Sequence, residues 1–139
     1  MQPLERNRLH ALDSIVDDRG ELVVIEAQQH VPFVIERVYC ILGKQGLARG
    51  FHAHHQLQEL LVCLSGSCRV VVDNGFERGD WLLDRPNQGL WVGPMEWREM
   101  HDFSEGVVLM CLADAHYDEA DYIRDYDQFL VEVRGEAVP

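Results

Sequence analysis

The chain has 139 residues, 47% of them hydrophobic, and a formal net charge of −12. This length and composition suit one domain over residues 1–139, with a core that needs neither disulfides nor a structural metal. The charge argues against a nucleic-acid partner, whose binding needs a basic surface, and no apolar run approaches the ~18 residues that cross a bilayer.

Short apolar runs separated by turn residues recur along the chain, and each run predicts a β-strand. Turns are expected at residues 17–20, 65–67 and 73–75, where Gly, Asp, Asn and Ser favour turn conformations. Only residues 118–130 change character, and they predict a short helix or two helical turns with carboxylates available as N-caps. The extended runs are residues 9–16, 21–26, 33–42, 60–64, 68–72, 76–84, 90–92, 97–103 and 107–112.

Strands at this spacing predict an all-β sandwich or barrel, and we favour a single-domain double-sheet jelly roll with a short helical tail. Residues 60–64 and 68–72 are interpreted as the two strands of a hairpin, joined by the turn at residues 65–67. The N-terminus has no apolar signal core, so we expect a cytoplasmic protein with no membrane partner. We also expect buried free thiols, because every cysteine lies in an apolar run and none forms a Cys-x-x-Cys pair: Cys40, Cys63, Cys68 and Cys111.

Residues 46–59 hold the densest group of reactive side chains. In an extended strand His52 and His54 project from the same face, and Ala53 projects from the other. Two imidazoles therefore point into one space.

Arginine dominates the cations, with eleven arginines and the single lysine Lys44. This ratio favours forked contacts to phosphate or carboxylate and leaves little room for Schiff-base chemistry. By strand alternation Arg49 faces away from His52, so it reaches the histidines only if Gly50 introduces a bulge.

The spacing around the histidines matches the first cupin motif, G-x5-H-x-H-x4-E-x6-G, at every fixed position: Gly46, His52, His54, Glu59 and Gly66. The second cupin motif normally adds a metal-binding histidine after a Pro-x-Gly corner. Here the corner is Gly93-Pro94, and Arg98 stands where that histidine would be. The motif indicates the fold more than the function.

Several separated segments, in the same order, resemble the WxcM-like cupin sugar 3,4-ketoisomerases: residues 49–54, 62–68, 97–104 and 117–127. Enzymes of that family convert a dTDP-4-keto-6-deoxyhexose into its 3-keto isomer, without a metal or other cofactor, for later transamination to 3-amino sugars. The resemblance therefore implies an isomerase that takes a dTDP-linked ketosugar and forms a homodimer.

The resemblance also implies the site: His54, His52 and Tyr39 as catalytic residues, Arg49, Arg98 and Arg19 as substrate-binding residues, and no metal. Moving a carbonyl from C4 to C3 requires removal of the C3 proton, an enediol or enediolate, and return of a proton to C4. Imidazole can act as base and then as acid near neutral pH. We assign His54 as the carbon base, His52 as its partner in orienting or moving protons, and Tyr39 as a donor to the oxyanion.

Two other functions stay open. His52, His54 and Glu59 form a plausible facial set for iron or zinc, which predicts a metal-dependent oxygenase or isomerase. A cupin that binds a sugar nucleotide without catalysis is the other. Metal analysis separates the first from a metal-free isomerase, and the His54→Ala variant separates catalysis from binding.

Overall fold

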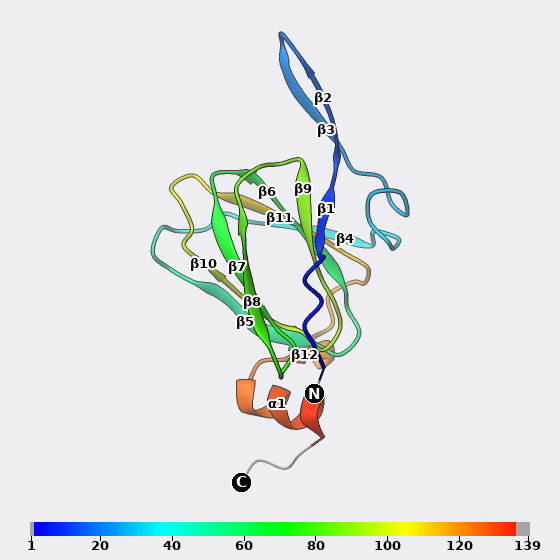
Figure 1. Ribbon diagram of the computed structural model, residues 1–139, viewed down its shortest axis with the longest axis vertical. Helices are drawn as coiled ribbons and strands as arrows, with labels where there is room; N and C mark the ends of the chain where they lie inside the picture. Colours follow the sequence, from blue (N-terminus) through cyan, green and yellow to red (C-terminus); the bar gives the residue numbers. More distant parts are fainter. Residues whose placement is uncertain (1, 136–139) are drawn as a thin grey trace.

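The computed structural model describes residues 2–135 and arranges them as two facing five-stranded sheets, with a hairpin at one end and a helix at the other (Figure 1). The first sheet contains, in spatial order, β1 (Leu9–Ala11), β9 (Gln88–Val92), β6 (Glu59–Ser65), β11 (Val108–Ala113) and β4 (Arg37–Ile41). The second contains β12 (Tyr122–Ile123), β5 (Arg49–His54), β10 (Trp97–His101), β7 (Cys68–Asp73) and β8 (Arg78–Leu83). The hairpin is β2 (Asp13–Asp17) with β3 (Gly20–Val24), and the helix is α1 (Tyr126–Arg134).

The predicted all-β cupin fold with a short helical tail is confirmed, but one local pairing is wrong. β6 and β7 are not a hairpin, because β6 pairs with β11 and β9 whereas β7 pairs with β10 and β8. The chain crosses between the sheets at Gly66, which has φ +71° and lies so close to Ser104 and Val107 that a Cβ would collide with them. A tight turn between apolar runs does not distinguish a hairpin from a crossover.

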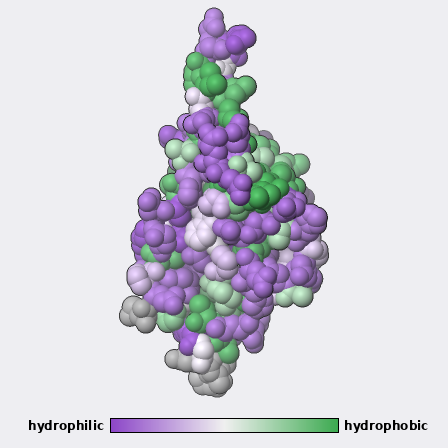
Figure 2. All heavy atoms as spheres, turned by 90° about the vertical axis from the view of Figure 1, so that its right-hand side faces the viewer, coloured by the Kyte–Doolittle hydropathy of each residue, from purple (hydrophilic) through white to green (hydrophobic). Residues whose placement is uncertain are grey.

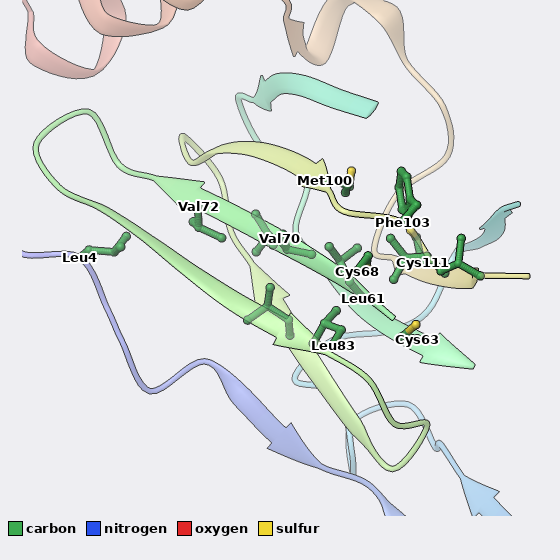
Figure 3. Packing of buried hydrophobic residues seen from close by; sticks show 14 residues of the cluster. Leu4, Leu61, Cys63, Cys68, Val70, Val72, Leu83, Met100, Phe103 and Cys111 are labelled. Atoms are coloured by element: carbon green, nitrogen blue, oxygen red, sulfur yellow. The ribbon is translucent and has the colours of Figure 1, made fainter. Parts of the chain in front are cut away.

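The main core fills the space between the two sheets (Figure 3). β6, β9 and β11 contribute Leu61, Leu90 and Leu109 from one side, and β7 contributes Val70 and other residues from the opposite side. Strand β6 is apolar on both faces because Leu60 and Val62 pack into a second cluster with residues of the N-terminal segment. This second cluster explains why residues 60–64 form a continuous apolar run rather than an alternating one.

The N-terminal segment is anchored by a buried arginine. Arg8 is 0% exposed, and its guanidinium donates to both carboxylate oxygens of Glu96 at 2.9 and 2.8 Å. The same guanidinium lies against the rings of Trp81 and Trp91, 5.3 and 5.6 Å from their centroids. These contacts hold the residues before β1 against the Gly93–Glu96 corner.

Three local expectations differ from the structure. The strand predicted over 33–42 is β4 alone, because the chain turns before it at residues 32 and 33. The tail is not one helix over 118–130: a 3₁₀ turn (Glu119–Asp121) and β12 precede α1, which Asp125 caps by accepting from the Gln128 amide. Cys40 is exposed, whereas the other three cysteines are buried, and all four are free thiols.

No helix within residues 2–135 has the length and apolarity needed to cross a bilayer.

Candidate active site

The histidine pair lies on one face of β5, as its alternation predicts. The rings of His52 and His54 are 5.0 Å apart between centroids and nearly perpendicular, at 89°. His54 is only 1% exposed. Ala53 points to the opposite face and packs into a cluster with Trp97 and residues of the tail.

A bulge in β5 brings Arg49 to the same side as the histidines. Across from β5, Arg98 pairs with His52 and Glu99 pairs with Gly50, so Phe51 is an extra residue without a partner on β10. Gly50 and Phe51 both have positive φ, +92° and +60°. A bulge at Gly50, the condition for Arg49 to reach the histidines, is present, and it reverses the alternation so that Arg49 lines the cavity beside His52.

A cavity of about 340 Å³ opens between the edge strand β4 and strand β5. Tyr39 contributes from β4, Arg49 and His52 from β5, and Tyr122 and Arg124 from the tail. His52 therefore faces the cavity, while His54 lies behind it, outside the lining. The acidic chain thus places two arginines and an imidazole around a space of ligand size.

Three buried polar side chains are tied together beside this cavity. Arg98 and Glu59 are both 0% exposed, and Arg98 donates to Glu59 Oε1 at 2.9 Å. Tyr39 donates its hydroxyl proton to Glu59 Oε2 at 2.8 Å. Burial, with the neighbouring carboxylate as the next contribution, raises the pKa of Tyr39 far above its usual value.

The residues do not fit a metal centre. Residues 2–135 contain no group of three His, Cys, Asp or Glu side chains placed to hold a metal ion. Glu59, the third ligand of the facial set considered above, accepts from Arg98 and Tyr39 with its two oxygens instead. Arg98 stands at the position of the metal-binding histidine of the second cupin motif, and its guanidinium pairs with Glu59.

Burial disfavours the charged form of both histidines. It lowers the pKa of His52 to about 4 and that of His54 to about 2, and in both cases the nearby positive charge of Arg98 acts in the same direction. Both imidazoles are thus neutral near pH 7. A neutral imidazole has one unprotonated nitrogen and can act as a base.

The tail completes the site with residues that the strand pattern did not single out. Asp121 Oδ2 lies 3.1 Å from His54 Nδ1, and the Tyr122 ring packs against His54 and His52 at centroid distances of 4.3 and 5.0 Å. Arg124 lies over Tyr122, 4.1 Å from its centroid, and donates to both carboxylate oxygens of Glu119. The only sequence signal for these residues was the resemblance over 117–127.

Two expected substrate-binding arginines lie outside the cavity of their own chain. Arg98 is buried behind the wall and also donates to the Glu96 carbonyl at 2.9 Å. Arg19 lies in the turn of the β2–β3 hairpin, where it donates to Asp17 and its side chain is 86% exposed. Of the three arginines, only Arg49 lines the cavity.

Comparisons with known proteins find one matching family model and relatives that are named as sugar 3,4-ketoisomerases. The family model FdtA (WxcM-like, C-terminal) matches residues 5–134. A TDP-4-oxo-6-deoxy-alpha-D-glucose-3,4-oxoisomerase from Aneurinibacillus thermoaerophilus is 52% identical over 124 residues, covering 88% of this chain and 89% of the relative.

Solved structures are similar over nearly the whole chain. A 3,4-ketoisomerase from Helicobacter canadensis has a TM-score of 0.88 and 41% identity, covering 91% of this chain and 96% of that one. A mutant 3,4-ketoisomerase from Thermoanaerobacterium thermosaccharolyticum, in complex with TDP-4-keto-6-deoxyglucose, has a TM-score of 0.91 and 38% identity, covering 98% of this chain and 100% of that one.

Proposed function

The chain belongs to the FdtA family (WxcM-like, C-terminal), and from this membership we infer that it is an isomerase, a dTDP-sugar 3,4-ketoisomerase that converts a dTDP-4-keto-6-deoxyhexose to its 3-keto isomer. The structural observation that supports the inference is the pair of neutral imidazoles beside a cavity lined by Arg49 and Tyr39. The reaction fits a place before transamination in the synthesis of 3-amino sugars.

We propose that His52 removes the proton from C3, because it is the imidazole that faces the cavity. This revises the order expected from the sequence, in which His54 was the carbon base. Electrons of the C3–H bond form the C3–C4 double bond, and the C4 carbonyl becomes an oxyanion. The resulting His52 imidazolium exchanges its proton with solvent and then delivers a proton to C4, which completes the exchange on carbon.

Tyr39 moves the hydroxyl proton in this scheme. Its high pKa makes a tyrosinate costly, so it gives and receives a proton in the same step. The phenol proton, which Tyr39 otherwise donates to Glu59, passes to O4. At the same time the O3 hydroxyl gives its proton to the phenol oxygen. The carbonyl then forms at C3. Arg98 contributes indirectly, because it holds the Glu59 carboxylate that orients the phenol.

Arg49 and Arg124 are placed to bind the diphosphate of the nucleotide. Both line the cavity, and a guanidinium matches phosphate oxygens with forked donors. The reaction needs no redox cofactor, because it only relocates two protons and a double bond. We propose that it needs no metal either, since the Glu59 oxygens are committed to Arg98 and Tyr39.

We propose a homodimer in which the hairpin contacts a second copy. Ile15 and Leu22 face each other across β2 and β3, and they are 62% and 57% exposed on an element that projects from the barrel (Figure 2). A two-stranded hairpin is marginal alone, and an uncovered apolar pair favours a partner surface. Within such a dimer Arg19 would reach substrate only in the cavity of the second copy.

The free thiols suit a cytoplasmic location.

The test is to incubate the purified protein with dTDP-4-keto-6-deoxyglucose in deuterated water and to follow the sugar by NMR. We expect the 3-keto isomer with deuterium at C4, at an unchanged rate after treatment with a chelator, and no product from the His52→Asn variant. An unchanged 4-keto sugar that still binds would show a binding module instead. Stoichiometric tightly bound iron or zinc, with activity lost on chelation, would contradict the metal-free mechanism.

A further inference from the structure

The carboxylate of Asp121 is held in place from three directions. Its Oδ1 accepts from the Gln56 amide at 2.9 Å, its Oδ2 accepts from the Leu57 amide at 3.2 Å, and Nδ1 of His54 lies 3.1 Å from Oδ2. Asp121 ends the 3₁₀ turn directly before β12, whose Tyr122 pairs with His54 on β5. Backbone hydrogen bonds on both sides thus hold the carboxylate opposite one nitrogen of one imidazole.

This geometry determines where the proton of His54 resides. An ionised carboxylate only accepts hydrogen bonds, so the ring nitrogen facing it must carry the hydrogen. A neutral imidazole has one N–H, and Nδ1 therefore takes it and leaves Nε2 with a lone pair. Burial keeps His54 neutral, because it lowers the pKa of the ring to about 2.

The opposite nitrogen is buried and has no partner within the described chain. His54 Nε2 is inaccessible to solvent and makes no hydrogen bond among residues 2–135. The ring is enclosed by His52 and Tyr122. Besides the Asp121 carboxylate, the charged side chains that act on it are Arg98, Arg37 and Arg124. An unsatisfied buried acceptor is costly, so its persistence beside the cavity-facing histidine calls for a functional reason.

We propose that Asp121 is a positioning residue for the ketoisomerase reaction: it holds His54 in the Nδ1–H tautomer, so that Nε2 remains an acceptor within the histidine pair. This inference rests on the proposed function. A lone pair beside His52 favours the imidazolium that forms when His52 takes the C3 proton, whereas an N–H at the same position would oppose it. Asp121 itself does not line the cavity.

The tautomer is measured directly by ¹⁵N NMR of histidine-labelled protein without substrate, with the His54 signals assigned by their loss in His54→Asn. We expect Nδ1 of His54 to show the shift of a protonated ring nitrogen and Nε2 that of an unprotonated one. In Asp121→Asn the amide group can donate to Nδ1, so the two shifts should exchange. A parent protein with hydrogen on Nε2 would overturn the proposal whether or not the variant folds.

Kinetics give the second readout. We expect Asp121→Asn to lower kcat by about 10²- to 10⁴-fold with KM nearly unchanged, because the ground-state contacts in the cavity remain. In a His54→Asn background the same substitution should have no further effect on the residual rate. A purely structural role would instead lower the rate in both backgrounds, and that result would refute the assignment.

Asp114→Asn is the matched control. Asp114 also accepts from a backbone amide in this loop, that of Gln58 at 3.1 Å, but it makes no hydrogen bond to a histidine among residues 2–135. We expect this variant to keep the parent's tautomer and kcat. If the parent does not isomerise the ketosugar, the proposed function fails while the NMR result still stands. If the parent is active and Asp121→Asn matches it in rate and tautomer, only the role of Asp121 fails.

Discussion

Individual charges in the site are arranged so that the reacting groups stay neutral. Arg98 pairs with Glu59 in the interior, and burial together with the positive charge of Arg98 lowers the pKa of His52 and of His54. Removing one member of such a buried pair leaves an unpaired charge, which costs several kcal/mol. In the proposed mechanism His52 is therefore available as a base because its buried position keeps the ring neutral.

The lowered pKa values predict a specific dependence of stability on pH. The unfolded chain binds a proton at His52 near pH 6.5, whereas the folded chain binds it only near pH 4. Between these values the unfolded state holds more protons, so the free energy of unfolding falls as pH is lowered, by about 3 kcal/mol for a shift of this size. Above pH 6.5 His52 is neutral in both states, and this loss of stability is absent.

Urea denaturation of the parent and of His52→Gln, at several pH values between 7 and 4, measures this effect. The parent should lose more stability than the variant across the window, because the variant lacks the titrating ring. Equal losses would show that His52 titrates normally. The kcat/KM of the parent should fall only as pH approaches about 4, where His52 becomes protonated.

At the scale of elements, the bulge in β5 decides which side chains share the cavity. Gly50 has φ +92°, and a Cβ there would lie 3.1 Å from the Arg98 carbonyl oxygen and 3.0 Å from Met100 Sδ. Gly50→Ala should therefore cost about 1 to 3 kcal/mol and weaken binding of dTDP, because Arg49 loses its position.

Gly46→Ala is the control for backbone strain alone. Gly46 also has a positive φ, +81°, but no atom lies within 4 Å of the position its Cβ would take. Thermal unfolding and calorimetric titration with dTDP compare the two variants. Equal stability and equal dTDP affinity in both would show that the bulge does not position Arg49.

Local pattern predicted the elements better than their partners. The alternation along β5 correctly placed His52 with His54, and the need for a bulge at Gly50 followed from the same rule. Strand pairing is not local: the turn after β6 has the composition of a hairpin, but it joins two sheets. Asp121 is 67 residues from His54, so no spacing rule connects them, and only the family-like tail pointed to that segment.

At the scale of the whole molecule, the projecting hairpin predicts the oligomeric state. Ile15→Lys combined with Leu22→Glu keeps a favourable cross-strand pair but removes the apolar surface. We expect sedimentation to show a dimer for the parent and a monomer for this double variant, because the second copy loses its apolar contact.

Leu82→Lys on β8 is the matched control, since Leu82 is 58% exposed and Leu22 is 57% exposed. It should leave the dimer intact. A monomeric parent, or a double variant that dimerises as tightly as the parent, would contradict the hairpin interface.

The position of Arg8 between Trp81 and Trp91 has an optical consequence. Two of the three tryptophans stack with one guanidinium, and that guanidinium belongs to the segment that leads into β1 and the hairpin. Any detachment of this segment from the barrel changes the surroundings of both indoles at once. Intrinsic emission therefore reports the docking of the N-terminal strand without an added label, even while the rest of the barrel stays folded.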